Sequence, residues 1–245
     1  MKDLFSQNSS LYQQRRPSYP SDFVSEILKY VPTRHFAWDC GAGSGQLTLL
    51  LAPYFEQLVA TDISRAQLQN APYLDNVSYQ VQSAEHTDFA AQSFDLITVA
   101  QAIHWFDFKD FYQEVKRTLK PDGVLAVLGY GTLTVSDPQL NQRIQHLYTQ
   151  TLAGHWEPER AHIDAHYQSI PFPFELVAEH NSQMQYQWTA AQLLGYLNTW
   201  SAIAHYRAQY PDQEPLAEIQ AYFAEDDQVK IELQFPLFLR IGRVA

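Results

Sequence analysis

Residues 36–46 read FAWDCGAGSGQ and carry the strongest structural signal in the chain. A short apolar stretch runs into Asp39, and glycine then occupies every second position at 41, 43 and 45 before a leucine-rich stretch begins. Glycine permits backbone angles that are closed to other residues and lets the main chain approach a ligand closely. This order of residue types predicts a buried strand, a tight turn that faces a ligand, and a helix.

The acid in this stretch indicates what kind of ligand the turn would face. Anions prefer bare N–H groups at a helix N-terminus, so a pyrophosphate site would avoid a carboxylate beside the turn. Asp39 instead suits a cationic or hydroxyl-rich ligand, although it is also placed to cap the following helix. Position 46 is Gln, so the G-x-G-x-x-G dinucleotide fingerprint is absent and an NAD-linked oxidoreductase is disfavoured.

Composition narrows the class of protein. The 245 residues are 46% hydrophobic, which suits one sizeable α/β domain. A formal net charge of -11 repels phosphate backbones and counts against DNA or RNA as a partner. Cys40 is the only cysteine and reads as a small buried residue. There is no signal-peptide pattern and no apolar run of about 20 residues, so we expect a cytoplasmic protein without a membrane partner.

Five short stretches rich in β-branched and aliphatic residues predict buried parallel strands, with helical stretches between them. These stretches are Phe36–Cys40, Leu58–Asp62, Val77–Gln82, Asp95–Gln101 and Val124–Tyr130. Two longer alternating stretches, Phe174–Trp188 and Lys230–Val244, predict an antiparallel pair at the sheet edge. The fold class is therefore α/β, with a doubly wound, mostly parallel seven-stranded sheet.

The rhythm of strands and helices changes after Tyr130. We expect one domain over residues 1–245, in which residues 1–20 form an N-terminal cap segment. Residues 131–173 and 189–212 then form a substrate lid inserted within that domain. Helices are expected from about 137 to 152, 189 to 201 and 214 to 224.

In an open α/β sheet the ligand lies outside the carboxyl ends of the strands, at a topological switch point. Asp62 ends the second predicted strand and falls roughly 20 residues past the glycine turn, a spacing at which an acid binds ribose hydroxyls. Capping of the next helix is the alternative role for Asp62. The third strand leads into Ser83-Ala84-Glu85, and the fourth leads through Gln101 into His104-Trp105.

Taken together, these strand ends resemble the class I S-adenosylmethionine-dependent methyltransferases, whose nucleotide turn is matched by D-C-G-A-G-S-G. The resemblance implies S-adenosylmethionine as cofactor and a Rossmann-like fold. It assigns Asp39 and Gly41 to the methionine end of the cofactor, Asp62 to the ribose and Ile63 to the side of the adenine. The full set of cofactor-binding residues that it implies is Asp39, Gly41, Ala42, Gly43, Asp62, Ile63, Ser83, Ala84, Glu85 and Gln101.

A closer resemblance extends along nearly the whole chain. Residues 12–20 read YQQRRPSYP, residues 102–107 read AIHWFD and residues 197–202 read LNTWSA. In that order these segments are similar to the trans-aconitate methyltransferase type. We therefore expect methyl transfer to a small molecule at a carboxylate oxygen, which needs no general base. An O-, N- or C-methyltransferase on another metabolite and a non-catalytic S-adenosylmethionine-binding protein are the alternatives.

Several residues are candidates for the acceptor site. Catalytic candidates are His104, Trp105 and Arg15, and substrate-binding candidates are Tyr12, Arg15, Trp105, Trp156 and Trp200. One of Arg15 and Arg16 is expected to fold over the site and pair with a substrate carboxylate, unless both are solvated. His104 would be the base for a hydroxyl or carbon acid, or else a packing residue. No metal site is predicted, and the sequence leaves the oligomeric state open.

Overall fold

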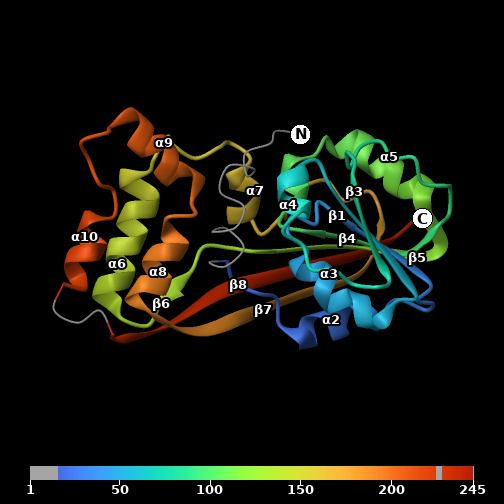
Figure 1. Cartoon of the computed structure of the whole chain (residues 1–245), viewed down its shortest axis with the longest axis horizontal. Helices are drawn as coiled ribbons and strands as arrows, with labels where there is room; N and C mark the ends of the chain where they lie inside the picture. Colours follow the sequence, from blue (N-terminus) through green and yellow to red (C-terminus); the bar gives the residue numbers. More distant parts are fainter. Residues whose placement is uncertain (1–15, 225–227, 245) are drawn as a thin grey trace.

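The computed structural model describes residues 16–224 and 228–244, and Figure 1 shows their arrangement. The candidates Tyr12 and Arg15 therefore lie outside the described residues. The strands are β1 (Phe36–Cys40), β2 (Gln57–Asp62), β3 (Val77–Val81), β4 (Phe94–Ala100), β5 (Leu119–Tyr130), β6 (Thr134–Val135), β7 (Glu175–Thr189) and β8 (Lys230–Arg243).

Helices connect the strands and also form a separate group. The helices are α2 (Ser21–Leu28), α3 (Gln46–Leu51), η2 (Ala52–Tyr54), α4 (Arg65–Leu68), η3 (Ile103–Trp105), α5 (Phe108–Thr118), α6 (Pro138–His146), the π-helical η4 (Leu147–Thr151), α7 (Arg160–Asp164), α8 (Ala190–Leu197), α9 (Ser201–Gln209) and α10 (Ala217–Tyr222). Within the described ranges, every helix is too short or too polar to span a bilayer.

One sheet joins all eight of these strands in the order β3-β2-β1-β4-β5-β8-β6, with β7 paired to the other edge of β8. Strands β1 to β5 pair in parallel, whereas β6 and β7 pair with β8 antiparallel, as β5 does. The predicted doubly wound α/β class is confirmed. The sheet has one strand more than expected because the two-residue β6 also pairs with β8.

Burial explains why β1, β4 and β5 were recognisable. Ala37, Trp38 and Cys40 of β1 are completely buried although they point to alternate faces, as expected when helices cover both sides of the sheet. The prediction that residues 77–82 are buried was wrong. Strand β3 lies at the edge of the sheet, and its residues are half-buried or exposed.

The helices after β5 gather at one end of the molecule. Figure 1 shows α6, α8, α9 and α10 together, apart from α2 to α5. Strands β7 and β8 run from one group of helices to the other, and α7 lies between the two groups. Helix α10 belongs to this group because the Arg143 guanidinium donates to the carbonyl of Glu218 at 3.3 Å and lies over the Tyr222 ring. The helical group therefore extends beyond residue 212, where we expected the lid to end.

The strand order creates the switch point. Strands β1 and β4 are neighbours, and the chain winds away from them in opposite directions, to β2 and β3 on one side and to β5 on the other. The loops that leave β1 and β4 therefore separate and open a crevice at the carboxyl ends. These loops begin after Cys40 and Ala100, beside the glycine turn and the segment that contains His104.

Candidate functional site

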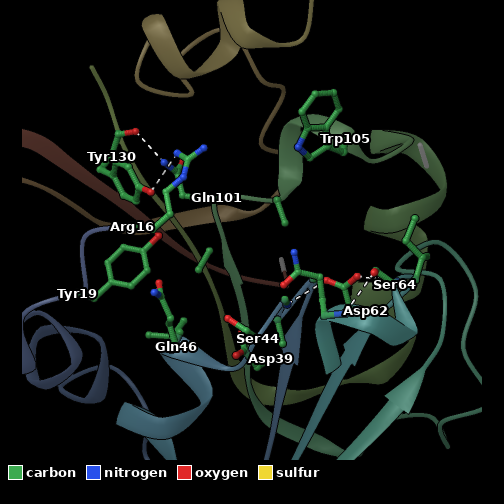
Figure 2. Close-up of a pocket in the computed structure, with 18 residues that line it drawn as sticks. Arg16, Tyr19, Asp39, Ser44, Gln46, Asp62, Ser64, Gln101, Trp105 and Tyr130 are labelled. Carbon is green, nitrogen blue, oxygen red and sulfur yellow. Dashed lines mark hydrogen bonds between the residues drawn. The ribbon is translucent and has the colours of Figure 1, made fainter. Parts of the chain in front are cut away.

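A cavity opens at this switch point. It encloses about 970 Å³ when the open solvent at its mouth is included. Figure 2 shows Arg16 and Tyr130 on one side, Trp105 on the opposite side, and Asp39 and Asp62 toward the base. We call it the first cavity; it is lined by Arg16, Tyr19, Asp39, Gly41, Ala42, Gly43, Ser44, Gln46, Leu47, Asp62, Ile63, Ser64, Gln67, Ala100, Gln101, Ala102, Trp105 and Tyr130.

The glycine turn forms one wall of the first cavity. Gly41, Gly43 and Gly45 have φ angles of +69°, +56° and +78°, in the left-handed region that side chains rarely adopt. A Cβ at Gly41 would lie 2.6 Å from that of Ala102, so the backbone there is closely packed. Apart from its chain neighbours, a Cβ at Gly43 would meet no atom of the described residues within 4 Å. The bare backbone of Gly43 thus faces space in which a ligand can approach.

Asp39 is a completely buried carboxylate beside this turn. It accepts hydrogen bonds from the hydroxyls of Thr48 on α3, at 2.6 Å, and Thr98 on β4, at 2.9 Å. Burial raises the pKa of Asp39 to about 6, although both hydroxyls act in the opposite direction. Because these two donors are neutral, the ionised carboxylate favours a positively charged ligand in the cavity.

The Asp62 carboxylate holds the second loop of the cavity in place. One oxygen accepts from the backbone N–H of Gly43 at 2.9 Å and the other from that of Ser64 at 2.8 Å. The Ser64 side chain in turn caps α4 by accepting from Gln67 N. Asp62 therefore joins the glycine turn to the start of α4, whose N-cap is Ser64 rather than Asp62. Asp62 also lines the cavity, and its contact with a ribose stays a prediction.

Gln101 also lines the first cavity, and its backbone is strained. Its φ angle is +53°, unusual for a residue other than glycine and costing on the order of 1 kcal/mol. Its backbone N–H donates to Leu128 O, and its side-chain amide donates to Tyr130 O at 2.9 Å. These bonds to β5 fix Gln101 between the ends of β4 and β5.

Most of the predicted cofactor residues meet at the first cavity. These are Asp39, Gly41, Ala42, Gly43, Asp62, Ile63 and Gln101. Ser83, Ala84 and Glu85 are not among the residues that line it, so their contact with the cofactor stays a prediction. The Ser83 hydroxyl donates to Glu85, which also accepts from Asp107 N at 3.1 Å, and Ala84 is buried in the core. These bonds hold the segment after the edge strand β3 beside the start of α5.

A second cavity adjoins the first. It shares Arg16, Gln101 and Trp105 with the first cavity, so the two are contiguous. It brings together predicted acceptor residues from three distant segments: His104 and Trp105, Trp156, and Trp200. The full lining is Arg16, Gln101, His104, Trp105, Trp156, Glu157, Arg160, Ile163, Trp200 and Ser201.

Two guanidinium groups line the second cavity. Arg16 donates to the Tyr130 hydroxyl at 3.4 Å and to Thr199 O at 3.3 Å, and it also lines the first cavity. Arg160 donates to the hydroxyls of Tyr148 at 3.0 Å and Thr132 at 2.9 Å. The cavity therefore presents positive charge from the N-terminal segment and from α7, which favours an anionic ligand.

His104 is buried at the wall of the second cavity. Its Nδ1 lies 2.9 Å from the Tyr167 hydroxyl, and its ring packs against Trp105. Burial, assisted by the charge of Arg160, lowers the pKa of His104 to about 3. The imidazole is therefore neutral at physiological pH, and a ring that binds a proton so weakly is a poor general base.

Sequence patterns missed several residues of the site. Arg16 was considered only as one of a pair with Arg15, although it is Arg16 that lies between the two cavities. Arg160 and Tyr130 were not expected there, and Glu157 was expected only as part of the lid segment 131–173. No local sequence motif marks these residues. For Arg160, the available signal was a basic residue in a short helical segment after residue 156.

Comparison with known proteins agrees with this geometry. The family described as "Methyltransferase domain" matches residues 38–127, which run from β1 to β5. A "Putative methyltransferase" of Dictyostelium discoideum is 34% identical over 250 residues, covering 98% of this chain and 95% of the relative. A "Probable S-adenosylmethionine-dependent methyltransferase" of Saccharomyces cerevisiae is 33% identical over 132 residues, covering 50% of this chain and 45% of its own.

Solved structures give the same result. The "Putative Type II Methyltransferase" from Anaeromyxobacter dehalogenans has a TM-score of 0.84 and 37% sequence identity to this chain. The match covers 93% of this chain and 97% of the other, and so includes the helical group as well as the sheet. With its glycine turn, buried acid and switch-point cavity, the chain belongs to the class I S-adenosylmethionine-dependent methyltransferases.

Proposed function

We propose that this enzyme transfers the methyl group of S-adenosylmethionine to a carboxylate oxygen of a small-molecule acceptor, and that the acceptor binds in the second cavity. The observation that carries the proposal is the position of Arg16. Its guanidinium lines both cavities, so it lies where a donor and an acceptor would meet. Guanidinium groups pair with carboxylates in bidentate geometry. The resemblance of three segments to the trans-aconitate methyltransferase type supports the same substrate class.

The first cavity fits the cofactor. Asp39 offers a buried negative charge to a cationic ligand, Asp62 offers carboxylate oxygens to hydroxyl groups, and Gly43 leaves its backbone open. When bound, S-adenosylmethionine supplies an electrophilic methyl on positively charged sulfur. Transfer of that methyl to a carboxylate oxygen would leave the electron pair of the S–CH₃ bond on sulfur, and no residue of this chain would have to remove a proton.

For such a reaction the main task of the protein is to position the methyl donor and the acceptor. A carboxylate and a sulfonium cancel their charges as they react, so a cavity that excludes water favours the step. Trp105, Trp156 and Trp200 provide apolar walls for this purpose. Holding the two reactants in line supplies roughly 7–11 kcal/mol of the barrier reduction. The net charge of -11 also favours a small acceptor over a nucleic acid.

We expect Arg16→Gln to lower kcat/KM for a carboxylate acceptor by about 100-fold, because a charge-assisted pair of roughly 2–3 kcal/mol is lost. The acceptor screen measures methyl esters by mass spectrometry before and after mild base. Arg207→Gln is the matched control, since Arg207 is an exposed partner of Glu214 outside both cavities. Only base-stable N- or C-methyl products in the screen would remove the carboxylate version of the proposal.

His104 separates carboxylate acceptors from those that need a base. For a carboxylate we expect His104→Gln to reduce kcat less than tenfold, because no proton has to be removed. Since the pKa of His104 is about 3, neither the wild-type enzyme nor the variant should show an inflection in kcat/KM from this residue between pH 5 and 9. A loss of 100-fold or more at saturating cofactor would instead favour a hydroxyl, amine or carbon acceptor with His104 as base.

A further inference from the structure

The second cavity contains a negative charge that an acceptor bearing only carboxylates would not explain. Glu157 lines it, and its side chain is 11% exposed. Its Oε2 accepts a hydrogen bond from the Ser201 hydroxyl at 2.7 Å, which fixes the orientation of the carboxylate. Its Oε1 is buried and has no hydrogen-bond partner among the described residues. A buried charged oxygen without a donor is costly.

The neighbouring histidine does not satisfy this oxygen in its neutral form. His205 Nε2 lies 3.6 Å from Glu157 Oε1, beyond hydrogen-bond distance. The Nδ1 of the same ring lies 2.9 Å from the carbonyl of His155, and a carbonyl can only accept. Nδ1 therefore carries the proton, and neutral His205 presents a lone pair to Glu157.

Arg160, one of the two arginines of this cavity, already has other partners. Arg160 donates to Tyr148 and Thr132, and its Nε lies 3.6 Å from Asp164. Its guanidinium also lies over the Tyr148 and Trp156 rings, at 5.4 and 5.2 Å from their centres. Among the ion pairs of the described residues, none within 4 Å joins Glu157 to an arginine or lysine. Over residues 16–224 and 228–244, Glu157 thus lines the cavity with no arginine or lysine within ion-pair distance.

We propose that Glu157 forms a subsite for a hydrogen-bond donor on the acceptor, so that the natural acceptor is a carboxylic acid that also carries a hydroxyl or ammonium group. This inference rests on the proposed function, because it places the acceptor in the same cavity. Arg16 pairs with the carboxylate to be methylated, and Glu157 Oε1 accepts from the second group. An acid without that group leaves the oxygen buried and unpaired, so Glu157 determines specificity.

The test uses acids matched in carbon skeleton: succinate, malate and aspartate form one set, and butyrate, 3-hydroxybutyrate and 3-aminobutyrate another. Their binding is measured by calorimetry with S-adenosylhomocysteine present, and kcat/KM is measured by ester formation. For the wild-type enzyme we expect a hydroxy or amino acid to be favoured over its plain counterpart by on the order of 10- to 100-fold. Preference for the amino acid over the hydroxy acid would identify ammonium as the donor.

Glu157→Gln keeps an oxygen for Ser201 but removes the charge, and it should reduce this preference at least tenfold. If Glu157 only held α9 in place through Ser201, Glu157→Gln would change the binding of plain and substituted acids equally. Glu159→Gln, two residues along and outside the cavity lining, should keep the wild-type ratio. An unchanged ratio in Glu157→Gln, or no binding of any acid, overturns the inference. If esters form but hydroxy and amino acids are not preferred, the inference fails and the proposed function stands. If the preference is seen in binding but no ester forms, the proposed reaction fails and the inference stands.

Discussion

Gly43→Val is expected to abolish S-adenosylmethionine binding, with an affinity loss of at least 1,000-fold, while the fold persists. The valine Cβ would meet no atom within 4 Å in the part of the chain that the structure describes, its chain neighbours aside, so the side chain extends into the space of the first cavity. A β-branched residue at a φ of +56° costs about 2 kcal/mol, which a domain with a stability of roughly 5–15 kcal/mol survives. Calorimetric titration with the cofactor measures the loss, and thermal unfolding measures the fold.

The chain offers a matched control for backbone strain. Gly154 also has a positive φ, +80°, and a Cβ there would likewise meet nothing within 4 Å, but it lies outside both cavity linings. Gly154→Val should therefore lower Tm by a similar amount and bind the cofactor like the wild-type protein. Equal affinity in the two variants would mean that the ligand does not occupy the space beside Gly43.

Asp39→Asn is expected to have opposite effects on stability and on binding. Burial raises the pKa of Asp39 from 3.8 to about 6, so folding favours the protonated carboxyl. Its contribution is fully present below about pH 4 and is lost as pH rises through about 6, a difference of roughly 3 kcal/mol. Asparagine stays neutral and can bond both Thr48 and Thr98, because hydroxyls donate and accept. At pH 8 the variant should thus unfold at a higher temperature.

Cofactor binding should change in the other direction. At pH 8 the ionised Asp39 attracts a cationic ligand, so Asp39→Asn should weaken S-adenosylmethionine binding at least tenfold. At pH 5 most of the ligand-free wild-type protein is already protonated at this residue, and the two proteins should bind more alike. Titrations and melts at both pH values measure these effects. A wild-type affinity that does not rise with pH, together with an unchanged variant, would refute the electrostatic role of Asp39.

Local sequence patterns predicted most of the parallel sheet and most of the residues that line the first cavity. Strand β1 was predicted with its observed bounds, and Asp39, Gly43 and Asp62 meet at the cavity as expected. These features follow from short-range rules: buried parallel strands need apolar runs, and a left-handed turn needs glycine. The same rules failed at β3, since they do not say which strand lies at an edge.

The residue pattern by itself therefore determined the fold class, the switch point and the chemistry of the donor side. The acceptor side was decided only by tertiary structure. Arg16, Trp105, Glu157 and Trp200 come from segments far apart in the chain. Resemblance singled out Trp105 and Trp200, but no short stretch of sequence shows that the four side chains line one cavity. They meet because the helical group packs as a unit against the ends of the long strands, and packing of large apolar surfaces depends on their combined shape rather than on any short stretch of sequence.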